Sequence, residues 1–167
     1  MERMERIIVA GLMLAMCLVS IAIAESRKEY RFSVGPQAKV AVDTQYGAIS
    51  VKPGSTNQVL ITATTKSDKA EVDTLQNGSR VEVGSRLLPG ADPQSGRVDY
   101  EVSVPPDATV RIRSATGPIS ADGLQGDVTL EGTAAQVEAK NLSRGHLLVQ
   151  TMNGPITLNN VHASHVE

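Results

Sequence analysis

Two stretches of this chain, Gly117-Pro118-Ile119-Ser120-Ala121 and Gly154-Pro155-Ile156-Thr157-Leu158, repeat one pattern 37 residues apart. Between them the same motif, an apolar residue followed two places later by another, begins at Val128, Val137 and Leu147. The leading positions are thus separated by 9, 9, 10 and 9 residues. Constant spacing is typical of a solenoid, because each coil must keep its inward side chains in register with the coil before it. Two steps predict a coil of about 18 to 20 residues.

The repeat also predicts which side chains point into the protein. Two inward residues separated by one outward residue form a short strand, and the glycine before the strand supplies the positive φ of a corner. The predicted inward column is Ile119, Ala121, Val128, Leu130, Val137, Ala139, Leu147, Val149, Ile156 and Leu158. The predicted outward column is polar apart from Leu148 and contains Ser120, Thr129, Glu138 and Thr157.

Alternating apolar and polar residues also run through the chain before this repeat, at 40–42, 49–51, 59–62, 81–83, 98–102 and 110–113. Glycine, proline, asparagine and aspartate separate these runs, which is typical of strands joined by turns. The sequence therefore predicts an all-β protein. We expect a parallel β-helix or β-solenoid-like region of regular coils over about 105–161, with less regular antiparallel strands on the N-terminal side. The alternative for residues 29–104 is a β-sandwich with regular hairpins.

The first 24 residues have the three-part layout of a secretory signal peptide. Arg3 and Arg6 precede an apolar run at 7–19, and the small residues of Ala22-Ile23-Ala24 form a cleavage site before the polar residues from Glu25 onward. The alternative is an uncleaved membrane anchor over 7–24, which could just span a bilayer. We therefore predict a signal peptide at 1–24 and a β domain at 25–167. Its location is predicted to be exported: the periplasm, the outer envelope surface or the medium.

The only cysteine, Cys17, lies in this leader, so the mature chain is expected to have no disulfide and no thiol chemistry. Export without disulfides favours a bacterial envelope protein over a small eukaryotic secreted domain. The formal net charge of -2 and an aromatic content of 2% argue against nucleic acid as a partner, because neither a basic patch nor stacking platforms are available. Membrane contact is expected only through an uncleaved leader.

The segments at 104–110, 117–128 and 153–156, together with Gly47-Ala48-Ile49, resemble the bacterial putative-adhesin family. The resemblance covers about 30–161 and rests on structural glycines and aliphatic residues. It implies an exported envelope domain with repeated Gly-x-Ile strands and a β-solenoid-like fold. It carries over no binding residue, and its members usually continue for more coils. Because residues 162–167 stand where a further coil would begin, either the sequence is a fragment, truncated at this end, or this strand edge pairs with another copy or partner.

Three groups of polar residues are candidate functional sites. Asp99 with Glu101, and Asp122 with Asp127 and Glu131, are carboxylates of the kind that act on polysaccharides; the structural alternative is that they are outward strand and turn residues. His146, His162 and His165 could bind a metal, but no closed ligand set is evident and surface histidines are favoured. Arg111 and Arg113 share one strand face and could meet an anionic polymer, or be solvated. We therefore assign no catalytic, cofactor-binding or metal-binding residue and expect no cofactor.

The sequence predicts a non-enzymatic domain of the cell envelope that acts in adhesion, scaffolding or protein binding. Its partner would be a protein or a surface polymer of the envelope, and the C-terminal strand edge could mediate self-association. The alternative is a β-helix enzyme that acts on polysaccharides.

Overall fold

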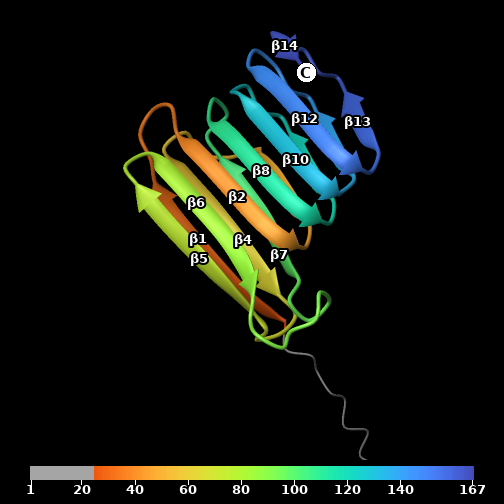
Figure 1. Ribbon diagram of the computed structural model, residues 1–167. Coiled ribbons are helices and arrows are strands. Elements are labelled where there is room, and N and C mark those ends of the chain that lie inside the picture. Colours follow the sequence, from red (N-terminus) through yellow and green to blue (C-terminus); the bar gives the residue numbers. More distant parts are fainter. Residues whose placement is uncertain (1–24) are drawn as a thin grey trace, which may run out of the picture.

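The computed structural model describes residues 25–167, so the predicted signal peptide and Cys17 lie outside the described residues. The described chain forms two seven-stranded mixed sheets, shown in Figure 1. In spatial order, sheet A contains β1 (Ser26–Ser33), β4 (Gln58–Thr65), β7 (Val98–Val104), β3 (Ile49–Pro53), β9 (Ile119–Asp122), β11 (Val137–Lys140) and β13 (Ile156–Asn159). Sheet B contains β14 (His165–Val166), β12 (His146–Asn153), β10 (Val128–Ala134), β8 (Thr109–Thr116), β2 (Lys39–Tyr46), β6 (Arg80–Leu87) and β5 (Ala70–Asn77). The prediction of an all-β protein is confirmed.

From β8 onward the chain alternates between the two sheets, and from β10 onward each strand pairs in parallel with the strand two places earlier. In sheet B, Val128 pairs with Val110 on one side and Leu147 on the other. In sheet A, Val137 lies between Ile119 and Ile156. Paired residues are therefore 18 or 19 positions apart, because the two apolar pairs of one repeat lie in different sheets.

The N-terminal strands pair in both directions, whereas the sequence predicted antiparallel strands in this part of the chain. The pairs β1–β4, β4–β7 and β5–β6 are antiparallel, as predicted. In contrast, β2 pairs in parallel with β6 and β8, and β3 pairs in parallel with β7 and β9. The corner between β2 and β3 is the reason, because it stacks on the corner between β8 and β9: Gly47 N donates to Thr116 O at 3.1 Å and Ile49 N to Pro118 O at 2.9 Å.

One hydrophobic core is built from side chains of both sheets. Seven of the ten predicted inward residues are buried in it: Ile119, Ala121, Val128, Leu130, Val137, Ala139 and Leu147. Val149 is half-buried, whereas Ile156 and Leu158 are each 45% exposed, so their predicted burial is wrong. The reason is their position in the sheet: in the described structure β13 is the outermost strand of sheet A and has a neighbour on one side only.

Tyr100 is the largest fully buried side chain of the described core. Burial raises the pKa of its phenol from 10.0 to about 12, and the nearby Ser85 hydroxyl opposes this shift. The Ser85 hydroxyl is itself hydrogen-bonded to the Thr44 hydroxyl at 2.8 Å. The Thr44 and Ser85 hydroxyls of sheet B thus lie close to the buried ring of Tyr100.

This buried phenol should make stability fall at alkaline pH. Between pH 10 and pH 12 the unfolded chain releases the Tyr100 proton while the folded chain keeps it. The free energy of unfolding should therefore decrease by roughly 2 to 3 kcal/mol across this window. Urea titrations of the native protein and of Tyr100→Phe at several pH values test this, since the variant should lack that part of the decrease. An equal decrease in both proteins would contradict it.

Candidate functional site

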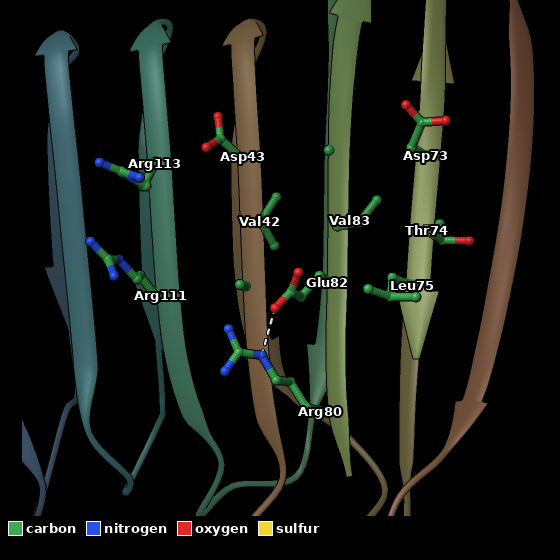
Figure 2. A pocket seen from close by; sticks show the side chains of 12 residues that line it. Val42, Asp43, Asp73, Thr74, Leu75, Arg80, Glu82, Val83, Arg111 and Arg113 are labelled. Carbon is green, nitrogen blue, oxygen red and sulfur yellow. Dashed lines mark hydrogen bonds and ion pairs between the residues drawn. The ribbon is translucent and has the colours of Figure 1, made fainter. Parts of the chain in front are cut away.

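A groove of about 400 Å³ crosses the face of sheet B that points away from the core. It runs over β8, β2, β6 and β5, and Figure 2 shows the side chains that line it. Its floor contains the two smallest lining residues, Ala41 on β2 and Gly84 on β6. The β-strand pairing places Asp43 beside Gly84 on one side, and Asp73 beside Gly84 on the other. At Gly84, β6 therefore has no side chain between these two carboxylates.

Gly84 is not a glycine that the backbone requires. It has no positive φ, and a Cβ at this position would meet only the Asp43 carbonyl oxygen at 3.6 Å, an ordinary contact. It follows Val81-Glu82-Val83 in an alternating strand, at a position where an outward side chain is expected. A glycine in a strand interior often marks a close approach of a ligand or another backbone. Here its effect is to leave room on the sheet surface.

The lining side chains carry balanced charge. Three arginines, Arg80, Arg111 and Arg113, are matched by three carboxylates, Asp43, Asp73 and Glu82. Figure 2 shows Arg80 paired with Glu82 at one end of the groove, at 2.5 Å. This formal balance favours a polar or zwitterionic ligand over a long polyanion.

Glu131 on β10 holds the two arginines of β8 in place. Its carboxylate lies 2.9 Å from Nη2 of Arg111 and 2.9 Å from Nε of Arg113, and its side chain is only 25% exposed. In Figure 2 both guanidinium groups point away from β2. One carboxylate thus fixes the wall of the groove at its β8 side.

A second hollow of about 370 Å³ continues the groove toward β12 on the same face. It shares Asp43 and Arg113 with the first and is also lined by Gly132 and Gln150. Strand pairing sets one row of outward residues across the sheet: Gln150, Glu131, Arg113, Asp43, Gly84 and Asp73. Five strand spacings make this row about 24 Å long. The shape suits an elongated ligand that crosses the strands.

Apart from Glu131 at the groove wall, the carboxylates considered from the sequence lie elsewhere and are held in structural contacts. Asp99 Oδ1 accepts a hydrogen bond from Ala48 N at 2.7 Å and pairs with Arg97 at 2.8 Å. Glu101 lies on the same strand of sheet A, is exposed, and is 3.5 Å from Arg27. Asp99 therefore closes the corner between β2 and β3.

Asp122 and Asp127 stabilise turns between stacked strands. Asp122 accepts a hydrogen bond from Asn141 at 2.8 Å, and Asn141 accepts one from Asn160 at 2.7 Å, so three turns are joined by one side-chain ladder. Asp127 accepts a hydrogen bond from His146 N at 2.8 Å. Asp122 ends β9 of sheet A, whereas Asp127 directly precedes β10 of sheet B and Glu131 lies on it, so the structure does not bring the three carboxylates together.

The structure brings together two of the three histidines. His146 and His165 are paired across β12 and β14, with ring centroids 6.1 Å apart, while His162 pairs with Ser143 in the preceding bridge. Within residues 25–167, no group of three histidine, cysteine or acidic side chains is placed to bind a metal ion. In the same residues, no helix is long and apolar enough to cross a membrane.

Of the residues that form the groove, sequence reasoning named only Arg111 and Arg113, together with Glu131 at the groove wall. Asp43, Asp73 and Gly84 were missed because they lie on three strands whose pairing was not predicted. One signal was available: Gly84 occupies an outward position inside an otherwise regular strand.

No family model matches this chain, and no curated protein matches it. One similar solved structure is the crystal structure of a "putative cell adhesion protein" from Clostridium sporogenes. Its TM-score is 0.37 at 11% sequence identity, and the match covers 84% of this chain and 99% of that one.

Proposed function

We propose that this protein is a non-enzymatic binding domain of the bacterial cell envelope, of the adhesion or scaffolding kind. The observation that carries the proposal is the groove on sheet B, which has a floor at Ala41 and Gly84 and fixed arginines along one wall. A groove that crosses several strands can follow an elongated segment of a protein or of an envelope polymer. Its balanced charge is suited to polymers that carry both amino and carboxyl groups, such as peptidoglycan.

The export of the chain and its membership of the adhesin-like family are part of the same proposal. The leader at 1–24 supports export, and the Gly-x-Ile repeats support the family. We also propose that residues 105–161 form a short solenoid. Support comes from the parallel pairing at intervals of 18 or 19 residues and from the Asp122–Asn141–Asn160 ladder that joins successive turns.

Structural roles of the acidic residues support a binding function over a catalytic one. Asp99, Asp122 and Asp127 each accept a hydrogen bond that closes a turn or corner. Glu131 is occupied by two arginines. A general acid or base must be free to contact a substrate, and these four carboxylates are already used.

Filling the groove should abolish binding without unfolding the protein. Residues 25–167 should sediment with purified bacterial sacculi, whereas Gly84→Leu should bind at least about tenfold more weakly, a loss of about 1.4 kcal/mol. The physical reason is that a leucine side chain would occupy the floor of the groove. A co-sedimentation titration measures both affinities.

Gly84→Ala is the matched control, because its methyl group meets only an ordinary contact. It should keep the melting temperature and most of the binding. If native protein does not bind sacculi, peptidoglycan is the wrong ligand. If it binds and Gly84→Leu binds equally well, the groove is not the binding site.

One observation favours the alternative of a polysaccharide-acting enzyme. Asp43 and Asp73 lie on either side of Gly84, two strand spacings or about 10 Å apart across the sheet. Inverting glycosidases place two carboxyl groups at a separation only slightly smaller. Release of reducing ends from a polysaccharide by the native protein, lost in Asp43→Asn, would support the enzyme and replace the binding proposal.

A further inference from the structure

A small hollow of about 190 Å³ extends the groove toward the start of β2 and β6. It is lined by Lys39, Val40 and Ala41 of β2, Arg80 of β6, and Thr109 and Arg111 of β8. Three of these residues are basic and none is acidic, so we call it the basic hollow. It shares Ala41, Arg80 and Arg111 with the groove, and the two are therefore continuous.

The strand pairing places two of these cations side by side. Lys39 pairs directly with Arg80, on strands about 4.8 Å apart, and like charges on directly opposed residues repel. Glu82 offsets the charge of Arg80, and Glu131 offsets that of Arg111. Within residues 25–167, however, Lys39 forms no ion pair. The basic hollow therefore carries an uncompensated positive charge.

A carboxylate without an ion pair lies on the same strand, four residues further along. Asp43 is exposed, lines the groove and has no cationic partner in the part of the chain that the structure describes. It lies on the same face of β2 as Lys39 and Ala41, because the alternate residues Val40 and Val42 are buried. Four residues of a strand span about 13 Å. This face of β2 thus presents one cation and one anion about 13 Å apart, with the small side chain of Ala41 between them.

We propose that this part of the groove binds a short extended peptide with free amino and carboxyl ends. The peptide carboxylate lies between Lys39 and Arg80, and the amino group lies beside Asp43, which Figure 2 shows far from Arg80 along the strand direction. Glu82 accepts a hydrogen bond from Nε of Arg80 at 2.5 Å, and a guanidinium has further N–H donors for a second carboxylate. Four extended residues span at most about 13 to 14 Å, which matches the separation of the two charges on β2.

The direction of this peptide differs from that of the residue row described above. The peptide runs along β2, whereas the row from Gln150 to Asp73 crosses the strands, and the two meet at Asp43. A polymer with a main chain and a short peptide branch therefore fits both. The inference rests on the proposed function and deepens it, because it assigns one part of the groove to the peptide component of the ligand.

Tetra-alanine with free ends is the probe that tests this subsite. An NMR titration of residues 25–167 should show saturable shifts of backbone amides on β2 and β6. Lys39→Gln and Asp43→Asn should each raise the dissociation constant about threefold to tenfold, because each removes one charge-assisted hydrogen bond at an exposed site. C-terminally amidated tetra-alanine should bind the native protein more weakly by a similar factor. Its affinity should not change further in Lys39→Gln, since the carboxylate that Lys39 contacts is already absent.

Lys52→Gln on β3 and Asp107→Asn before β8 are the matched controls. They make the same charge changes at exposed positions away from the groove and should bind tetra-alanine like the native protein. A native protein without saturable binding would overturn the inference, as would Lys39→Gln and Asp43→Asn variants that bind as well as the controls.

Co-sedimentation with sacculi distinguishes this inference from the proposed function. Sacculus binding that is unchanged in both Lys39→Gln and Asp43→Asn would overturn the peptide subsite and leave the groove as the binding site. Binding of tetra-alanine without binding of sacculi would support the subsite and reject peptidoglycan as the polymer.

Discussion

Leu130→Asp is expected to leave residues 25–167 unfolded. Leu130 is fully buried on β10, between β8 and β12, where its side chain contributes to the core from the centre of sheet B. An unpaired carboxylate at this position loses its hydration without gaining a partner, which costs several kcal/mol in addition to the lost apolar burial. Because typical domains have only about 5 to 15 kcal/mol of stability, this one change should be sufficient. Circular dichroism and urea denaturation measure it.

Val149→Asp is the comparison that makes this expectation specific. The sequence pattern placed Val149 in the same inward column, but the structure leaves it half-buried on β12. Its carboxylate can reach water, so the loss of stability should be well below that of Leu130→Asp. Equal losses in the two variants would show that both positions are equally buried. A native melting temperature for Leu130→Asp would refute its assignment to the core.

Gly117→Ala is expected to destabilise the protein by more than about 4 kcal/mol, at the upper end of single substitutions. Gly117 has a φ of +132°, a conformation that residues with a Cβ rarely adopt. An added Cβ would also lie 2.0 Å from the carbonyl oxygen of Gly47, a backbone atom that cannot move aside without separating two stacked corners. Thermal unfolding followed by circular dichroism measures the loss.

Two other glycines distinguish the cost of the positive φ from the cost of the close contact with backbone. Gly78→Ala meets no atom within 4 Å but has a φ of +59°, so it should cost only about 1 to 2 kcal/mol for the left-handed backbone. Gly84→Ala has neither problem and should change stability by less than about 1 kcal/mol. If Gly117→Ala costs no more than Gly78→Ala, the close contact between the corners is not a determinant of the fold.

Much of the C-terminal architecture could be predicted because its determinants are local and periodic. A glycine corner, two apolar residues in alternation and a fixed interval identify the strands β9 to β13 and their inward faces. The errors at Ile156 and Leu158 have one cause. The alternation of apolar and polar residues predicts which face of the sheet a side chain occupies. Its burial also depends on whether another strand lies beside it.

The groove could not be predicted because it depends on pairings between distant segments. Asp43, Gly84 and Asp73 come together only through the pairing of β2 with β6 and of β6 with β5. Likewise, β2 pairs with β8 although 70 positions separate Val40 from Val110. The composition of a turn indicates where a strand ends but not which strand pairs with it. The sequence pattern of residues 29–104 is equally compatible with regular hairpins.

The interval of 18 or 19 residues between stacked strands has a consequence for how such proteins change in length. Duplication of one such segment, for example the 19 residues from Val128 to His146, would add one strand to each sheet and lengthen the protein by about 4.8 Å. The strand edges at both ends would stay as they are. Each row of outward residues that crosses sheet B would become longer by one residue. Related proteins could therefore differ in length by whole units of this kind, while the contacts between the existing strands stay unchanged.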